Sequence, residues 1–151
     1  MAKEIINNNL FFDYVVEIID SSEDERVELA IKGVSMFPTL KEQQDRVVLM
    51  GLGGCELFIG AIALFRCNGK YLLHRLIAVD GQWLVFKGDN IKSSTERVKR
   101  EDVVAIVESI IKRDGRVVSC LDDDYKKGVK IYLIYVKFYN LFRRILKRLT
   151  R

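Results

Sequence analysis

The sequence predicts a mainly β protein with an antiparallel, barrel-like core, one helix before it and one helix after it. The first observation is a set of three turn signals, Asn68-Gly69, Asp80-Gly81 and Asp114-Gly115, which separate short apolar segments. Asn or Asp followed by Gly tolerates the positive φ angles of tight hairpin turns. The second is the spacing of these segments, which is typical of antiparallel sandwiches and barrels. The third is helical periodicity at both ends of the chain.

The N-terminal helix is expected over residues 8–20, where Asn residues provide caps at its start. Its apolar residues recur at helical spacing, at Phe11, Tyr14 or Val15, Ile18 and Ile19. A polar cluster over residues 21–25 ends this helix.

A strand is expected next, because Val27, Leu29 and Ile31 alternate with more polar residues as in a half-buried strand. The end of this strand leads into Ser35. Further strands are predicted over residues 46–50, 61–66, 71–79, 83–87, 103–112 and 116–120.

The C-terminal helix is expected over residues 126–149, where apolar side chains recur every three to four positions. They are Ile131, Ile134 or Tyr135, Phe138, Leu141 or Phe142, Ile145 and Leu149. We therefore divide the chain into a β domain with its N-terminal helix, residues 1–125, and a basic amphipathic helix, residues 126–151.

Charge is distributed unevenly between these two parts. Residues 126–151 carry nine Lys and Arg and no Asp or Glu, which gives this segment a charge of +9. Because the whole chain has a net charge of +4, the other 125 residues sum to −5. This asymmetry indicates an anionic partner for the segment alone. Either the helix packs across the β core, or it makes peripheral contact with an anionic membrane. Nucleic acid is disfavoured, because stacking residues are not regularly placed on a defined platform.

Composition excludes several classes of protein. With 151 residues, 49% of them apolar, the chain has the size of one domain that buries a core. Cys55, Cys67 and Cys120 lack short paired spacing, which indicates reduced thiols and neither a disulfide framework nor a metal site. The glycine cluster at 51–54 is not followed by Lys-Ser or Lys-Thr, so nucleotide binding is not supported and no cofactor is expected.

The sequence also bears on location. Its N-terminal residues lack a basic n-region, an apolar h-region and a small-residue cleavage site, so no secretory signal is expected. No run of about 18 uncharged apolar residues is present. We therefore expect the chain to work in the cytoplasm, with the basic segment as a peripheral contact at the inner membrane face.

The stretch from Gly33 to Leu40 places Ser35 on a turn, and His74, the only histidine, lies 39 residues further on in an apolar segment. A serine hydroxyl and a neutral imidazole are sufficient to begin acyl-transfer chemistry, because the ring takes the hydroxyl proton as the oxygen attacks a carbonyl. Taken alone, Ser35 is an ordinary turn residue and His74 an ordinary core histidine. The assignment therefore depends on the motifs around them.

Four motifs occur in order: Ser35-Met36-x-Pro38-Thr39-Leu40, Gly60-x-Ile62-x-x-Phe65, His74-Arg75 and Lys87-Gly88-Asp89-Asn90. Together they resemble the signal peptidase family over roughly half to two thirds of the chain. The His-Arg pair resembles the branch that uses histidine rather than lysine as the base, and more narrowly the small bacterial signal-peptidase-like proteins without a membrane anchor. The resemblance implies the β fold that signal peptidases share with self-cleaving repressors.

The resemblance also implies roles for individual residues. Ser35 would be the nucleophile and His74 the base. Asp89 would support the site, either by orienting the imidazole or by holding its loop. Arg75 would pair with the region of Asp89.

A third catalytic carboxylate is less clearly placed. In the endoplasmic-reticulum branch it follows the Gly-Asp-Asn motif by six positions, which is Thr95 here. Glu96, one position further on, is the first substitute and Asp102 the second, although both are also ordinary surface acids. A Ser-His dyad assisted by Asp89 is the remaining alternative.

The resemblance further indicates how the negative oxygen of a tetrahedral intermediate would be bound. The Ser35 backbone N–H supplies one hydrogen-bond donor, and Met36 fixes the chain after it. Many relatives add a hydroxyl two positions before the nucleophile, where this chain has Gly33. Because loss of such a donor costs about 3 kcal/mol in activation free energy, slow turnover is expected.

The sequence therefore predicts a serine endopeptidase that binds a leader or signal-like peptide as an extended strand along a β edge and cuts it after a small residue. No metal or organic cofactor is expected. The alternative is a peptide-binding module of the same fold with weak or no catalytic activity, which the departures at Gly33 and Thr95 favour.

Overall fold

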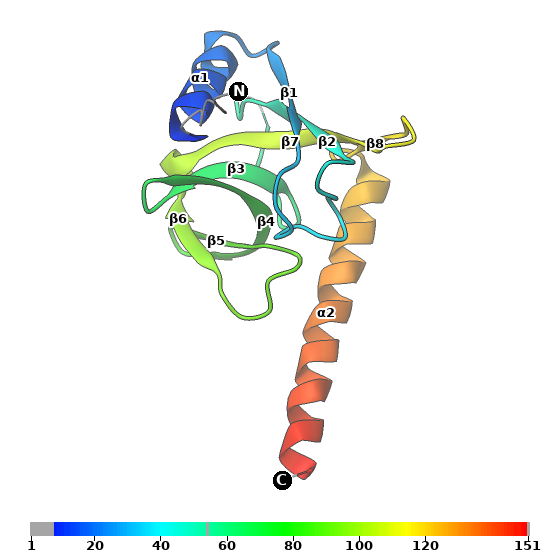
Figure 1. The fold of residues 1–151 in the computed structure, drawn as a ribbon. Coiled ribbons are helices and arrows are strands. Elements are labelled where there is room, and N and C mark those ends of the chain that lie inside the picture. The colour runs from blue at the N-terminus through cyan, green and yellow to red at the C-terminus, as the bar shows by residue number, and fades with distance from the viewer. Residues whose placement is uncertain (1–7, 54, 151) are drawn as a thin grey trace, which may run out of the picture.

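The computed structural model describes residues 8–53 and 55–150. The N-terminal residues considered above for a secretory signal, Gly54 of the glycine cluster and Arg151 of the basic segment lie outside the described residues. The elements in chain order are α1 Asn8–Ser21, β1 Arg26–Ala30, β2 Arg46–Met50, β3 Ile62–Cys67, β4 Lys70–Asp80, β5 Trp83–Lys87, β6 Glu96–Lys99, a 3₁₀ turn Arg100–Asp102, β7 Val103–Ile111, β8 Val117–Ser119 and α2 Asp123–Leu149 (Figure 1).

All strand pairs are antiparallel, in the order β1-β2-β7-β3-β4-β5-β6 with the short β8 beside β7. The sheet curls strongly but does not close (Figure 1), because the end strands β1 and β6 pair only with β2 and β5. The prediction of a barrel-like core is therefore wrong, since closure needs a ladder between the two end strands. Helices of 14 and 27 residues also make the protein mixed α/β rather than mainly β.

The predicted hairpins are confirmed. Asn68-Gly69 joins β3 to β4, Asp80-Gly81 joins β4 to β5, and Asp114-Gly115 joins β7 to β8, each an antiparallel pair. The sequence did not predict β6, because Glu96–Lys99 contains one apolar residue between charged ones. Pairing with β5, rather than its own pattern, makes this segment a strand.

Two apolar clusters form the core. In the first, Val15 and Ile19 of α1 pack on one end of the sheet with Leu49 and other side chains of β2, β3 and β7. In the second, the rings of Phe65 and Phe86 stack with their centroids 4.2 Å apart. Burial of each such side chain contributes about 1.5–3 kcal/mol. These clusters give β3, β4 and β5, which surround the candidate site, a rigid support.

The C-terminal helix α2 contacts the loop that precedes β3 through its first turns. Val129 is buried against Gly60, and the Lys126 ammonium lies 4.7 Å from the ring centroid of Phe58. Beyond them α2 projects away from the sheet (Figure 1), and apart from the half-buried Val136 its large apolar side chains from Ile134 to Leu149 are 44–77% exposed. Packing of the whole helix across the β core, one of the two expectations, is therefore wrong. Among the described residues, no helix has the length and apolarity needed to cross a membrane.

Candidate active site

Ser35 lies in the turn that follows β1. Two hydrogen bonds close this turn: the Phe37 N–H donates to the Val34 carbonyl at 3.1 Å, and the Leu40 N–H donates to the Met36 carbonyl at 2.9 Å. Met36 and Leu40 are buried in the core, so they anchor the turn from below. Ser35 is left half-buried, with access to a groove.

His74 lies on β4 and links Ser35 to Glu96. Its Nε2 atom is 3.1 Å from Ser35 Oγ, and its Nδ1 atom is 2.9 Å from Glu96 Oε2. An ionised carboxylate only accepts hydrogen bonds, so Nδ1 carries the proton of the neutral ring and Nε2 presents its lone pair to the serine hydroxyl. In this arrangement the ring can take the serine proton while the carboxylate stabilises the resulting imidazolium.

Of the candidate third carboxylates, Glu96 is the one that reaches His74. It stands at the start of β6, opposite Phe86 in the register with β5. The Asp102 carboxylate instead accepts the Lys99 N–H at 3.2 Å and closes the 3₁₀ turn after β6. The sequence left this choice open because it did not predict β6, which sets the direction of the Glu96 side chain.

Asp89 binds Arg75 rather than the imidazole. The Nε and Nη2 atoms of Arg75 donate to the two carboxylate oxygens of Asp89, each at 2.8 Å, and Nη1 donates to the Gly60 carbonyl at 2.7 Å. The two side chains are only 2% and 4% exposed. Burial lowers the pKa of Arg75, but the hydrogen bonds and charge of Asp89 more than offset this, so the pKa is raised. Of the two roles considered for Asp89, the contacts support holding the loop.

The loop after β5 also holds the serine turn through Asn90. The Asn90 N–H donates to the Ser35 carbonyl at 2.8 Å, and its side-chain amide donates to the preceding carbonyl at 3.0 Å. The Asp89 N–H donates to Met36 Sδ at 3.4 Å, which gives Met36 its supporting contact. Asn90 was not among the predicted site residues. It belongs to the motif that supplied Asp89, but a contact to a distant backbone carbonyl leaves no pattern of its own in the sequence.

Gly88 leaves space for the contact between Ser35 and His74. A Cβ atom at this position would lie 2.6 Å from the Ser35 carbonyl oxygen and 3.2 Å from His74 Nε2. The first distance is shorter than real Cβ atoms tolerate. Close approach of the loop to Ser35 and His74 is the reason for glycine here.

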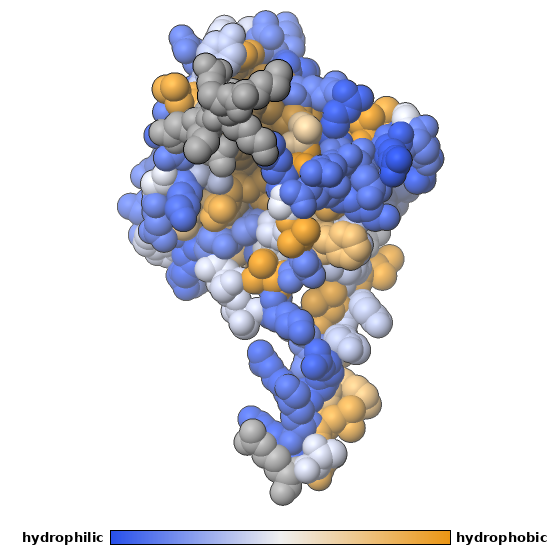
Figure 2. Space-filling model, in the orientation of Figure 1, coloured by the Kyte–Doolittle hydropathy of each residue, from blue (hydrophilic) through white to orange (hydrophobic). Residues whose placement is uncertain are grey.

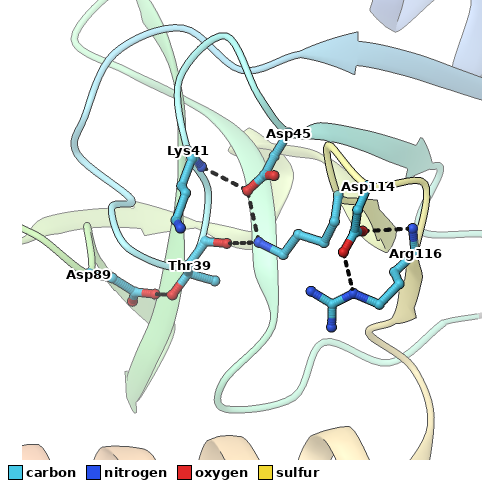
Figure 3. A network of polar contacts seen from close by, with 7 residues as sticks. Thr39, Lys41, Asp45, Asp89, Asp114 and Arg116 are labelled. Atoms are coloured by element: carbon cyan, nitrogen blue, oxygen red, sulfur yellow. Dashed lines mark hydrogen bonds and ion pairs between the residues drawn. The ribbon is translucent and has the colours of Figure 1, made fainter.

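A second, partly buried ion pair supports the far end of the serine turn (Figure 3). The Lys112 ammonium donates to the Thr39 carbonyl and to Asp45 Oδ2, both at 2.8 Å. The Thr39 hydroxyl in turn donates to Asp89, so the two ion pairs are connected through this residue. Burial raises the pKa of Asp45, but the hydrogen bonds from Lys112 and from the Lys41 N–H outweigh it, and the pKa is lowered.

A groove of about 710 Å³ extends from Ser35 and His74 toward α1. Residues 29–33 at the end of β1 and residues 71–74 of β4 line it, together with Phe11 and Phe12 of α1. β1 is an end strand, and the register of β4 with β5 begins only at Arg75. Within the described part of the chain, no strand covers these two edges, and an extended peptide can add to such edges.

The Ser35 N–H is the donor that the resemblance assigns to an oxyanion. The Ser35 N–H makes no hydrogen bond to another described residue. Gly33 has φ = 81°, a left-handed conformation in which a residue with a side chain is strained. The backbone of this turn therefore explains why the position lacks a hydroxyl-bearing residue.

The described residues contain neither a candidate metal site nor a disulfide bond. Across 8–53 and 55–150, no group of three or more His, Cys, Asp or Glu side chains is placed to hold a metal ion. Cys55, Cys67 and Cys120 are unpaired, and burial raises the pKa of Cys120 to about 11.

Comparison with known proteins gives no match to a protein-family model, to a curated protein or to a solved structure.

Substitutions of the two carboxylates are expected to have different effects. Glu96→Gln replaces the carboxylate with a neutral amide, which cannot stabilise the imidazolium by charge and can donate to the ring and so favour the wrong tautomer, and the rate at which Ser35 reacts with a fluorophosphonate should fall on the order of 10³–10⁴-fold with little loss of stability. Asp89→Asn leaves Arg75 buried without its counter-charge and should lower the free energy of unfolding by about 3–5 kcal/mol. Urea denaturation and labelling kinetics on both variants separate the two roles. Similar destabilisation by both changes would contradict the assignment.

Gly88→Ala is expected to slow the reaction of Ser35 on the order of 100-fold, because the new methyl group pushes the loop away from the catalytic pair. Gly128→Ala is the matched control, since a Cβ atom there meets nothing within 4 Å. Labelling rates measured for both variants provide the check, and equal rates would show that the loop has room to adjust.

Asp45→Asn is expected to change the pH dependence of stability. Because the pKa of Asp45 is lowered from 3.8 in the folded protein, its stabilising contribution is complete above that value and is lost as the pH falls through the lowered pKa. The difference in unfolding free energy between wild type and variant should therefore be largest above pH 3.8 and should shrink as the pH falls below that value. A difference that stays constant down to strongly acidic pH would show that Asp45 does not titrate in this way.

Proposed function

We propose that this chain is a serine endopeptidase resembling signal peptidase, which cleaves a leader or signal-like peptide by a Ser-His mechanism. The observation that carries the proposal is the line of hydrogen bonds from Ser35 through His74 to Glu96. Its order of hydroxyl, imidazole and carboxylate is the one that recurs in serine hydrolases of unrelated folds. The four sequence motifs that resemble signal peptidase meet at this site, which supports the same assignment.

In the proposed reaction, Ser35 Oγ attacks the carbonyl carbon of the scissile peptide bond as its proton passes to His74 Nε2. Glu96 stabilises the imidazolium, and the Ser35 N–H donates to the developing oxyanion. The imidazolium then returns the proton to the leaving amine, which completes an acyl-enzyme on Ser35. A water molecule, deprotonated by the same ring, hydrolyses this ester.

The substrate would bind as an extended strand in the groove between β1 and β4. Main-chain hydrogen bonds to these edges supply affinity, and the apolar floor of the groove supplies side-chain selectivity. Cleavage after a small residue is carried over from the resemblance. We place the reaction on the cytoplasmic side of the membrane, where the three unpaired thiols stay reduced.

The second candidate function is a peptide-binding module of the same fold with weak or no cleavage. The observation that favours it is Gly33, which provides no hydroxyl to the oxyanion. Loss of one such donor costs about 3 kcal/mol in activation free energy, which slows a reaction without removing its nucleophile.

Labelling of the native protein by a serine-reactive fluorophosphonate tests the proposal. We expect labelling between about pH 6 and 9 that is lost in Ser35→Ala and in His74→Gln, because the reaction needs both the hydroxyl and the ring that takes its proton. Ser94→Ala, a change at an exposed serine, should label like the wild type. Absence of labelling across this pH range in folded protein would instead favour the peptide-binding module.

A further inference from the structure

The projecting part of α2 carries a continuous apolar stripe. Its central line is Ile131, Tyr135, Phe138, Phe142, Ile145 and Leu149, at alternating intervals of four and three residues. This spacing keeps all six on one side of a helix. The flanks are Ile134, Tyr139, Leu141 and Leu146, and all ten side chains are exposed. At 100° per residue the stripe spans an arc of about 160°.

The stripe points away from the catalytic domain. Val129, which is buried against Gly60, lies about 200° from Ile131 around the helix. Leu133 and Val136 are half-buried and lie on the side of Val129. The face opposite the stripe is therefore the one that contacts the rest of the protein, whereas the ten side chains of the stripe are exposed.

Cations occupy the rest of the projecting helix. They are Lys137, Arg143, Arg144, Lys147 and Arg148, and no Asp or Glu follows Asp124 in the chain. Figure 2 shows hydrophilic groups along one side of this part of α2 and hydrophobic groups along the other. The Arg143 guanidinium lies 5.9 Å from the ring centroid of Tyr139, which places a cation at the border of the stripe.

We propose that α2 binds the interface of an anionic lipid bilayer, with the stripe in the outer acyl region and the cations among the headgroups. Long Lys and Arg side chains at the border of an apolar face reach the headgroups while their stems stay in apolar surroundings. Charge complementarity favours this occupant, because anionic headgroups offset cations that no acidic side chain of α2 neutralises.

A second copy of α2 fits less well than a lipid surface. An arc of about 160° is wider than the narrow seam that two helices bury in a coiled coil. A second copy would also bring the same uncompensated cations and no acids. Aromatic side chains within the stripe suit a bilayer interface, where one end of the group is apolar and the other is wet.

This inference does not depend on catalysis, but it has a consequence for the candidate site. Gly60, which Val129 contacts, accepts a hydrogen bond from Arg75, the residue after His74. Because the start of α2 is held at the base of the site, membrane binding would place the groove at a fixed position relative to the lipid surface.

Flotation of the full-length protein with vesicles tests the proposal. We expect binding to vesicles of phosphatidylcholine and phosphatidylglycerol in equal parts, weakened by salt, and much weaker binding to phosphatidylcholine alone. The combined substitution Arg143→Gln, Arg144→Gln, Lys147→Gln and Arg148→Gln should weaken binding on the order of 100-fold or more. Phe138→Ser with Phe142→Ser should weaken it on both kinds of vesicle.

Matched variants in the catalytic domain provide the controls. Lys32→Gln, Lys70→Gln, Lys92→Gln and Arg113→Gln remove four exposed cations elsewhere, and Val79→Ser with Val117→Ser removes two exposed apolar side chains. These variants should bind like the wild type, while circular dichroism verifies that the α2 variants keep their helix. Equal effects of control and α2 variants, or a wild-type dimer that Phe138→Ser with Phe142→Ser dissociates without any vesicle binding, would overturn the proposal.

Discussion

The buried ion pair between Arg75 and Asp89 is the interaction on which the geometry of the candidate site depends. Two charges removed from water cost several kcal/mol each, and the cost is offset here by two parallel hydrogen bonds and a third to the Gly60 carbonyl. Asp89 lies in the loop after β5, and the N–H of the next residue, Asn90, donates a hydrogen bond to the Ser35 carbonyl. The ion pair therefore fixes the distance between the serine turn and β4.

Adjacent residues of β4 take separate parts in this arrangement. Side chains of successive strand residues point to opposite faces, so His74 can face Ser35 and Glu96 while Arg75 faces Asp89. One strand thus carries the proposed base and the residue that braces the loop beside it. Glycine is needed at position 88 because this bracing brings the loop close to the Ser35 carbonyl and to the His74 ring.

The open edge of the sheet and the start of α2 both lie next to the candidate site. If β1 paired with another strand on its free edge, the groove between β1 and β4 would be filled by the protein's own backbone. Openness leaves room for a peptide strand beside Ser35. Val129 packs α2 against Gly60, whose carbonyl accepts a hydrogen bond from Arg75, so the start of the helix lies next to the ion pair.

Features with local causes follow from the amino-acid sequence alone. Asn-Gly and Asp-Gly pairs specified the three hairpins, and periodicity specified both helices, because turn chemistry and amphipathic spacing act within a few residues. The sequence also singled out Ser35, His74 and the Gly88-Asp89-Asn90 loop through motifs. Three further features emerge only in the folded chain: Glu96 and not Asp89 contacts the imidazole, the end strands stay apart, and most of α2 is exposed. These outcomes depend on strand register, on a buried ion pair across 14 residues and on packing between distant segments, and none of them leaves a local pattern in the chain.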